Sequence, residues 1–289
     1  MKGIILAGGT GSRLKPVTRY ISKHLLPVYD KPMIYYSLSI LMLARIRDIL
    51  LICTPRDIEN YKKLLGDGSW LGISITYMQQ KEPRGLAEAF ILGKNFIYDK
   101  PVCMVLGDNI FYGSGLVDKL KTASKLEVGA KIFAYKVRDP ERFGVVEFDN
   151  AKNIINIEEK PCNPKSSYAI TGLYFFDKHV TEYASQCIPS ARGELEITDI
   201  LKAYLRSEAL QVELLGRGYA WLDTGTNKSL MEAGKFVETV ERRQGYKIAC
   251  LEEISYFNGW RSLEELISSS ETQNAPAYHD YVCSRFNSE

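Results

Sequence analysis

The feature that most restricts the fold of this chain is the alternation of short apolar runs with longer amphipathic segments in its first half. The runs are rich in Val, Ile and Leu and are bounded by Gly, Pro or Asp, which is typical of buried parallel strands. They are Ile4–Ala7, Ile49–Cys53, Ile73–Met78 and Val102–Leu106, and the helices predicted between them are Met33–Ala44, Asp57–Leu65 and Leu86–Phe96. Strand, helix and strand at this spacing predict a parallel α/β sheet covered by helices.

The spacing changes at about Ala130, where closely spaced strands replace the alternation. The strands predicted there are Lys131–Val137, Val145–Phe148, Ile154–Glu158 and Tyr168–Phe176, and the helices predicted after them are Thr198–Leu205, Thr226–Arg243 and Ser262–Ile267. The pattern predicts one mixed α/β domain with an inserted or appended smaller sheet and a peripheral helical segment at its C-terminal end.

Charge and apolar patterning exclude several classes of protein. Lys and Arg total 37 and Asp and Glu total 35, a net charge of +2, whereas a general nucleic-acid binder is expected to be strongly basic. A local cationic pocket for a small anion stays possible. No uninterrupted apolar run is long enough for a membrane span, and the apolar start breaks at Gly8 and Gly9 too early for a signal peptide.

The cysteines are scattered and form no C-x-x-C pair. They are Cys53, Cys103, Cys162, Cys187, Cys250 and Cys283. In a chain with no export signal this distribution predicts reduced thiols and a cytoplasmic location, without a disulfide framework or a zinc site.

A glycine-rich loop, Gly8-Gly9-Thr10-Gly11-Ser12-Arg13-Leu14, follows the first predicted strand. Glycines let backbone N–H groups approach a polyphosphate without obstruction by Cβ, and Arg13 adds a permanent bidentate cation. Leu14 stands where a dinucleotide fingerprint has its third glycine, and no Gly-Lys-Ser/Thr follows as in a Walker A loop. The alternative is a tight turn that binds nothing.

Two further segments extend this candidate phosphate site. Lys23, held before Pro27, could supply a second cation, although a lone lysine is more often solvated. His24 is interpreted as a surface residue or as one that lies behind the ligand contacts. Gln80 follows a predicted strand at the sheet edge where ligands bind, and its amide could read a pyrimidine edge, although polar side chains are common at strand ends.

Two carboxylates follow apolar stretches at separate places in the chain. Asp108 follows the predicted strand Val102–Leu106, in the segment Gly107-Asp108-Asn109. Asp223 lies in the segment Trp221-Leu222-Asp223-Thr224-Gly225. Two carboxylates on rigid strand ends make a plausible Mg²⁺ site that phosphate oxygens and water would complete. Either aspartate could instead cap a helix.

The second half of the chain adds residues suited to a sugar phosphate. Carboxylates and backbone groups that could read hydroxyls occur in Phe143–Val146, Glu158–Pro161, Tyr168–Gly172 and Arg192–Glu196. Lys160 and Arg192 are cations that could hold a monophosphate. Without further context, Glu159 and Lys160 are more often a solvated charge pair.

The chain resembles the sugar nucleotidyltransferase family over roughly Lys2 to Ile254. The segments that carry the resemblance are, in order along the chain, Gly3–Leu14, Ser22–Met33, Leu106–Asn109, Glu158–Pro161, Arg192–Asp199 and Trp221–Gly225. The first motif is shared by the whole family. Arg-Gly-Glu-Leu-Glu-Ile-Thr-Asp and Tyr-Ala-Trp-Leu-Asp-Thr-Gly narrow the resemblance to its glucose-1-phosphate thymidylyltransferase branch, also called dTDP-glucose pyrophosphorylases.

The resemblance implies a Rossmann-like, mostly parallel mixed sheet flanked by helices, with an inserted smaller sugar-binding sheet. It implies a catalytic domain over residues 1–245, with the sugar-binding part at about 130–220, and a C-terminal helical segment over 246–289 that serves packing or regulation. It also implies a homotetramer in the dTDP-rhamnose or a related deoxysugar pathway of polysaccharide biosynthesis, inhibited by an end product such as dTDP-rhamnose.

Carried over position by position, the resemblance also implies the site residues. Those implied to bind the nucleotide dTTP are Leu6, Gly8, Gly9, Thr10, Gly11, Ser12, Arg13, Lys23, Gln80, Pro83, Gly85 and Asp108. Those implied to bind glucose 1-phosphate are Asn109, Gly144, Glu159, Lys160, Ile170, Tyr174 and Arg192. Asp108 and Asp223 are implied to bind Mg²⁺, and the catalytic set is Arg13, Lys23, Asp108, Lys160 and Asp223.

Three positions depart from the family pattern. His24 stands where Gln is usual, Phe143 where Tyr is usual, and Arg84 where an acidic residue commonly precedes Gly85. Phe143 loses any hydrogen bond that the Tyr hydroxyl would make. Arg84 is expected to place a cation beside the base pocket and to affect its selectivity.

The implied reaction is a single Mg²⁺-assisted in-line displacement, in which glucose 1-phosphate attacks the α-phosphorus of dTTP and pyrophosphate leaves. Three alternatives stay open. They are a pyrophosphorylase specific for UTP or another sugar 1-phosphate, a nicotinamide-dependent oxidoreductase, and a catalytically inactive sensor of sugar nucleotides.

Overall fold

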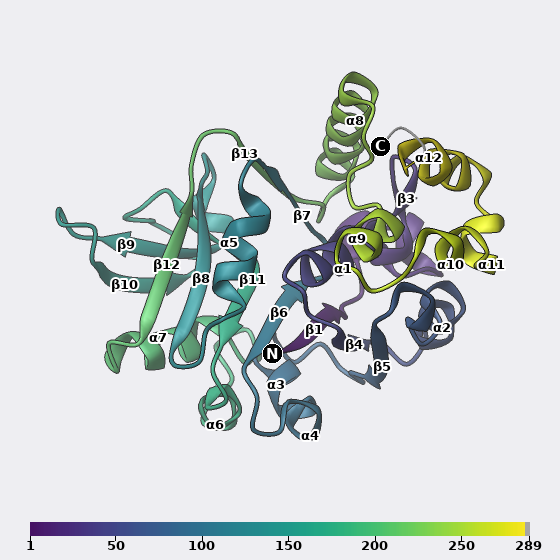
Figure 1. Cartoon of the computed structure of the whole chain (residues 1–289). Helices are drawn as coiled ribbons and strands as arrows, with labels where there is room; N and C mark the ends of the chain where they lie inside the picture. Colours follow the sequence, from purple (N-terminus) through teal and green to yellow (C-terminus); the bar gives the residue numbers. More distant parts are fainter. Residues whose placement is uncertain (287–289) are drawn as a thin grey trace.

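The computed structural model describes residues 1–286, and within them a nine-stranded mixed sheet runs through the molecule (Figure 1). Its parallel part consists of β5 (Ser74–Gln79), β4 (Asp48–Cys53), β1 (Lys2–Ala7) and β6 (Val102–Leu106), in that spatial order. These are the four strands that the apolar runs predict. Their carboxyl ends therefore meet at one edge of the sheet, where ligands of open α/β sheets bind.

The antiparallel strand β11 (Tyr168–Phe176) joins the two parts of the sheet. It pairs with β6 through its last residues, with β8 (Ala130–Lys136) along its length and with β9 (Gly144–Phe148) through its first residues. The strand β10 (Ile154–Glu159) continues from β9, and β12 (Leu210–Leu215) lies parallel to β8. The predicted fold class is confirmed, and the expected smaller sheet is continuous with the main sheet through β11.

Helices cover both faces of the sheet because alternate strand residues point to opposite sides. In β1, Ile5 and Ala7 belong to one core, and Ile4 and Leu6 belong to the other. The first core includes residues of α1 (Met33–Leu43), α2 (Ile58–Leu65) and α5 (Leu116–Ala123), and the second includes residues of α3 (Glu88–Leu92), α4 (Lys94–Ile97), α6 (Val180–Ser185) and α7 (Ile197–Arg206).

The single helix predicted over Leu86–Phe96 is wrong, because the structure has two short helices there. Helix α3 ends where α4 begins, at Gly93. A Cβ at Gly93 would lie 2.9 Å from the carbonyl oxygen of Ala89, so this position has no room for a side chain. The prediction also missed α5, β12 and the antiparallel pair β7 (Asn109–Gly113) and β13 (Tyr219–Asp223), together with the small pair β2 (Pro27–Val28) and β3 (Lys31–Pro32).

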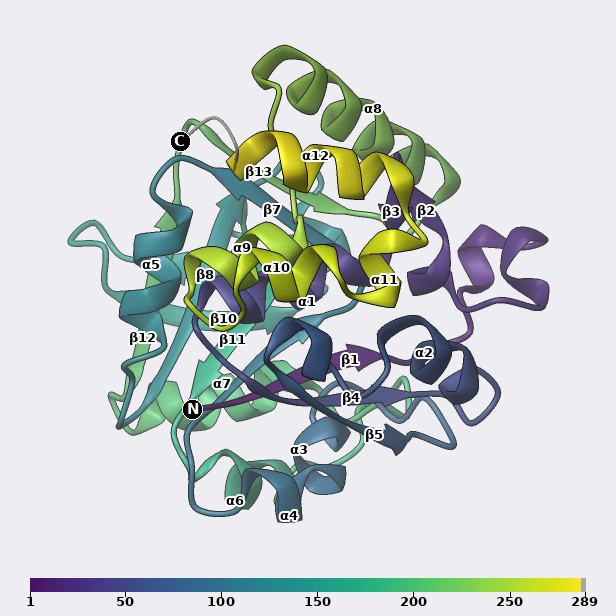
Figure 2. The same ribbon diagram turned by 45° about the vertical axis from the view of Figure 1, so that its right-hand side comes forward.

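The C-terminal helices form a layer beside α1. The long helix α8 (Asn227–Gln244) begins at a capping box of Thr226 and Ser229 and ends at Gly245. Helix α9 (Leu251–Phe257) packs on α1, and Figure 2 shows it near α10 (Leu263–Ile267), α11 (Ser270–Gln273) and α12 (Pro276–Phe286). Helices α9 to α12 lie within the stretch 246–289, and residues 287–289 of that stretch lie outside the described residues.

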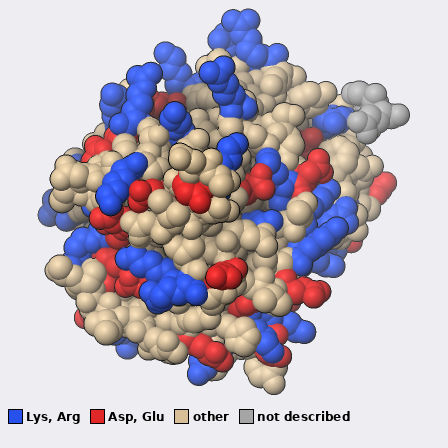
Figure 3. All heavy atoms as spheres, turned by 90° about the vertical axis from the view of Figure 1, so that its left-hand side faces the viewer, with Lys and Arg blue, Asp and Glu red and all other residues tan. Residues whose placement is uncertain are grey.

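Three properties of the described residues bear on the composition arguments. None of the helices within 1–286 combines the length and apolar character that a bilayer crossing requires. The six cysteines are free thiols. On the face shown in Figure 3, basic and acidic side chains are interspersed rather than sorted by sign.

Candidate active site

Two adjoining cavities open at the carboxyl ends of the parallel strands. The larger has a volume of about 320 Å³ and the smaller about 190 Å³. Both are lined by Leu86, Leu106, Asp108 and Glu194, so the cavities meet at these residues. A ligand in one cavity would therefore lie next to a ligand in the other, with Asp108 between them.

The smaller cavity is built on the glycine loop. Gly8 and Gly9 line it directly after β1, together with the predicted residues Leu6, Lys23, Gln80, Pro83, Gly85 and Asp108. Gly11 adopts a left-handed conformation with φ 59°, and its carbonyl accepts a hydrogen bond of 2.7 Å from Thr18 Oγ1. A short 3₁₀ turn, Ser12–Leu14, then carries Arg13 into the lining of the larger cavity. Thr10, Gly11 and Ser12 lie outside the lining of both cavities.

Gln80 lies at the inner wall of the smaller cavity. It is buried at the end of β5, and its Nε2 donates a hydrogen bond of 2.8 Å to Glu88 Oε2. Its Oε1 faces Gly8 so closely that a Cβ at Gly8 would collide with it. Gly85, with φ 106°, lies against the backbone of Leu195, where any side chain would also collide. The two glycines therefore allow the walls of the cavity to approach one another.

Arg84 does not line either cavity itself, but it lies between the lining residues Pro83 and Gly85. Its guanidinium pairs at 3.7 Å with Glu88, the partner of Gln80, and the side chain is 58% exposed. Phe143, the second departure, lines the larger cavity and packs on Trp221 with ring centroids 5.0 Å apart. The ring of Phe143 is thus held by packing on Trp221 and needs no hydroxyl for this contact.

His24 is buried, which excludes the interpretation of a surface residue. Its Nδ1 lies 3.2 Å from Ser22 Oγ and 3.3 Å from the hydroxyl of Tyr61, and its ring packs against Gly107. Burial lowers the pKa of His24 to about 3, and the neighbouring ammonium of Lys23 acts in the same direction. The ring is therefore neutral near pH 7 and supports the turn that carries Lys23.

The buried neutral ring predicts an acid-sensitive contribution to stability. An unfolded histidine binds a proton below about pH 6.5, whereas His24 in the folded chain does so only near pH 3. The free energy of unfolding should therefore fall by about 1.4 kcal/mol between pH 7.5 and pH 5.5. Urea unfolding at pH 7.5 and 5.5 should show this loss in the native chain and its absence in His24→Gln.

His179→Gln is the matched control for this measurement, because the His179 side chain is 50% exposed. It should retain the pH dependence of the native chain. Equal pH dependence in His24→Gln and the native chain would contradict the assignment of a neutral buried ring.

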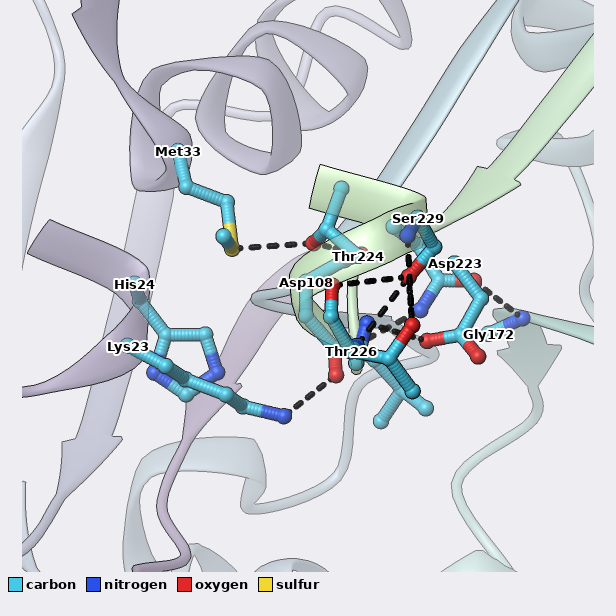
Figure 4. Close-up of polar contacts among 12 residues, drawn as sticks. Lys23, His24, Met33, Asp108, Gly172, Asp223, Thr224, Thr226 and Ser229 are labelled. Atoms are coloured by element: carbon cyan, nitrogen blue, oxygen red, sulfur yellow. Dashed lines mark hydrogen bonds and ion pairs between the residues drawn. The ribbon is translucent and has the colours of Figure 1, made fainter. Parts of the chain in front are cut away.

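Asp108 and Asp223, far apart in the sequence, are brought together by the pairing of β7 with β13. Asp223 is the register partner of Asn109, and the backbone N–H and the hydroxyl of Thr224 donate to the Asp108 carbonyl at 3.1 and 2.8 Å. Figure 4 shows Lys23 pointing toward Asp108, with Asp223 lying nearby across the turn. Neither carboxylate caps a helix, since Thr226 is the N-cap of α8 and Asp108 precedes a strand.

The two carboxylates repel each other and are partly neutralised by cations. Burial alone would raise the pKa of Asp108, but the ammonium of Lys23 holds it well below its usual range. Burial raises the pKa of Asp223, and the charge of Asp108 raises it further. A buried and a half-buried carboxylate that repel one another at the edge of the cavity fit the donor set that Mg²⁺ prefers.

Asn109 lines the larger cavity, but all of its side-chain contacts are internal. Its Nδ2 donates to Asp108 Oδ1 at 2.9 Å. Its Oδ1 accepts from the backbone N–H of Gly172 at 3.1 Å and from Trp221 Nε1 at 2.5 Å. Asn109 therefore fixes Asp108 against β11 and β13, a positioning contact that the sequence pattern alone did not indicate.

The larger cavity collects the residues predicted for the sugar phosphate. In addition to Asn109, its lining includes Gly144, Glu159, Lys160, Ile170, Tyr174 and Arg192. Arg192 is held by Glu159 at 3.2 Å and by the buried Glu196 at 2.9 Å, and Lys160 lies 3.8 Å from Glu159. Burial and the charge of Glu196 raise the pKa of Glu159. The cavity thus combines two cations with carboxylates, as a phosphorylated sugar would require.

Several residues of this lining were not assigned individually to the site by the sequence prediction. They are Leu86, Leu106, Arg142, Glu194, Glu196, Ile197, Thr198 and Trp221. Some lie within the stretches Arg192–Glu196 and Trp221–Gly225, whose density of charged and aromatic residues was the available signal. Arg142 gave no such signal, because a lone arginine in a loop is usually solvated.

Comparisons with known proteins agree with this geometry. A family model of nucleotidyl transferases matches residues 2–240. The glucose-1-phosphate thymidylyltransferase of Neisseria meningitidis is 58% identical over 98% of both chains, and that of Mycobacterium tuberculosis is 52% identical over 98% of both chains.

Solved structures share the fold. A Bacillus anthracis protein described as a glucose-1-phosphate thymidylyltransferase, solved with sucrose, is 44% identical with a TM-score of 0.76, covering 82% of this chain and 94% of that one. A UDP-glucose pyrophosphorylase solved with UDP-glucose is 23% identical with a TM-score of 0.72, covering 83% and 98%, and is similar in fold alone. The chain belongs to the nucleotidyl transferase family, and within it to the glucose-1-phosphate thymidylyltransferases.

Proposed function

We propose that this chain condenses dTTP with α-D-glucose 1-phosphate to form dTDP-glucose and pyrophosphate. The observation that carries the proposal is the pair of adjoining cavities that share Asp108. One is built on a glycine loop with Gln80 at its wall, which suits a nucleoside triphosphate. The other contains Lys160 and Arg192, which suit a sugar monophosphate.

In the proposed reaction, a phosphate oxygen of glucose 1-phosphate forms a bond to the α-phosphorus of dTTP, while the bond from that phosphorus to the bridging oxygen breaks. Pyrophosphate leaves with the electron pair. The nucleophile is already an anion, so the reaction needs no general base. The obstacle is repulsion, because two unit charges 4 Å apart at an effective dielectric of 20 repel by about 4 kcal/mol.

The cationic residues are proposed to offset this repulsion. Arg13 and Lys23 would hold the triphosphate, and Lys160 and Arg192 the phosphate of the sugar. Gln80 and Gly85 would contact thymine, and Gly144, Glu159 and Ile170 the glucose. Asp108 and Asp223 would hold Mg²⁺, which neutralises phosphate charge when bound.

The test is a pyrophosphate-release assay of four nucleoside triphosphates against several sugar 1-phosphates, with and without EDTA. We expect the dTTP and glucose 1-phosphate pair to exceed every other pair in kcat/KM by about tenfold or more, and EDTA to abolish release. A higher value for UTP or for another sugar 1-phosphate would replace the proposed substrates.

The same assay separates the other classes of function. A binding-only sensor would bind dTDP-glucose without releasing pyrophosphate from any pair. A nicotinamide-dependent oxidoreductase would quench or enhance NAD(P)H fluorescence on titration, whereas the proposed enzyme would leave it unchanged.

Further properties are proposed from the resemblance. They are a homotetramer, inhibition by a dTDP-sugar such as dTDP-rhamnose, and a role in the first step of a deoxysugar pathway that supplies polysaccharide synthesis. The free thiols support a reducing, cytoplasmic location. Analytical ultracentrifugation and an inhibition curve with dTDP-rhamnose would test the first two.

A further inference from the structure

Every carboxylate oxygen at the proposed metal site already has a partner. Asp108 Oδ1 accepts a hydrogen bond from Asn109, and Asp108 Oδ2 pairs with Lys23. Asp223 Oδ1 accepts from the backbone N–H of Gly225 at 3.0 Å, and Asp223 Oδ2 pairs with Arg142 at 3.0 Å. Each carboxylate thus has one backbone or amide donor and one cation.

The cation on Asp108 is a residue already assigned to phosphate binding. Lys23 lines the smaller cavity, and in the proposed function it contacts the triphosphate. Arg142 stands in the same relation to Asp223, and it lines the larger cavity with Lys160 and Arg192. The symmetry suggests that Arg142, like Lys23, exchanges a carboxylate for a phosphate.

The surroundings of Arg142 allow such an exchange. It ends the 3₁₀ turn Pro140–Arg142, and its side chain is 39% exposed. Its second nitrogen pairs with Asp139 at 2.6 Å, and its guanidinium lies 5.0 Å from the ring centre of Phe143. Asp139 lines a third cavity of about 170 Å³ that Arg142 also lines. Arg142 can therefore leave Asp223 while it stays tethered to Asp139.

We propose that Arg142 is a displaceable counter-ion of Asp223. In the free protein it holds the oxygen of Asp223 that a divalent cation would need, and in the loaded protein it binds the reacting phosphates. The inference rests on the proposed function for the identity of those phosphates. A guanidinium can donate two parallel hydrogen bonds to two oxygens of one phosphate group. Asp223 accepts from Arg142 through one oxygen only, so a phosphate would be the better partner.

The proposal predicts opposite effects of one substitution on metal binding and on turnover. Arg142→Gln removes the competitor for Asp223, so Mn²⁺ without nucleotide should bind the variant at least threefold more tightly than the native chain. Electron paramagnetic resonance of free Mn²⁺ measures this affinity. With saturating Mg²⁺ and both substrates, the same variant should turn over at least tenfold more slowly, because a phosphate contact is lost.

Arg138→Gln is the matched control. Arg138 precedes Asp139, is exposed and does not line the cavities described, and its substitution removes the same charge. It should leave both Mn²⁺ affinity and turnover within twofold of the native values. Circular dichroism of each variant checks that the fold is retained.

The proposal would be overturned if Arg142→Gln bound Mn²⁺ no more tightly than the native chain. It would also be overturned if the turnover of Arg142→Gln were unchanged. The Mn²⁺ measurement uses no substrate, so it can be interpreted even if the native chain releases no pyrophosphate. Failure of the substrate assignment and failure of the Arg142 assignment are thus distinguishable.

Discussion

Replacing Asp108 by Asn is expected to lower turnover at least about 100-fold while the chain stays folded. Asp108 lines both cavities, and Lys23 keeps it ionised by holding its pKa well below the usual range. An amide keeps the size of the side chain but carries no charge, so the proposed site loses half of its anionic ligands. Steady-state pyrophosphate release at saturating substrates and Mg²⁺ measures the loss.

Asp118→Asn is the control for this substitution, because Asp118 lies exposed on α5 and away from both cavities. It should turn over at the native rate. Near-normal turnover in Asp108→Asn would remove Asp108 from the proposed metal site. Loss of the native circular dichroism signal in this variant would show that the role of Asp108 is structural instead.

Replacing Arg13 by Ala is expected to cost about 3 kcal/mol of barrier, or about two decades in turnover. Within residues 1–286 Arg13 makes no ion pair, and its guanidinium lies beside Gly225, where a Cβ would be 2.7 Å from its terminal nitrogen. It is thus a cation at the cavity wall whose charge acts on the nearby carboxyl of Asp223 without forming an ion pair with it. Its loss should slow the attack on the α-phosphorus, during which negative charge builds up on the leaving pyrophosphate. It should leave the free energy of unfolding almost unchanged.

Arg19→Ala provides the comparison, since Arg19 ends the next 3₁₀ turn and stacks on Tyr20 away from the cavities. Turnover of that variant should match the native value. A loss of less than tenfold in Arg13→Ala would mean that another cation holds the triphosphate.

The periodicity of the chain was sufficient to predict the strands of the main sheet except β12. Buried strands such as β1 and β6 are continuous apolar runs, because both of their faces are covered by helices. The pairing of β7 with β13, which brings Asp108 and Asp223 together, was missed because each strand has only five residues and the two lie far apart in the sequence. The break between α3 and α4 was missed because a lone glycine inside a helical pattern is usually tolerated.

Individual residues show the same limit at the candidate site. His24 and Arg142 are ordinary surface residue types, and only the packing around them makes one a neutral buried ring and the other a partner of Asp223. Asn109 was predicted as a sugar contact, and it lines the larger cavity, but its side chain is hydrogen-bonded to Asp108, to Gly172 of β11 and to Trp221 of β13.

Local order in the sequence determined the strands, the glycine loop and which residue types could bind phosphate, because these depend on neighbours along the chain. The tertiary structure alone decided which carboxylates meet and which cation each of them holds. Those pairings join residues more than eighty positions apart, as in Lys23 with Asp108 and Arg142 with Asp223. Their energies depend on burial and distance, and neither is a property of any short stretch of sequence.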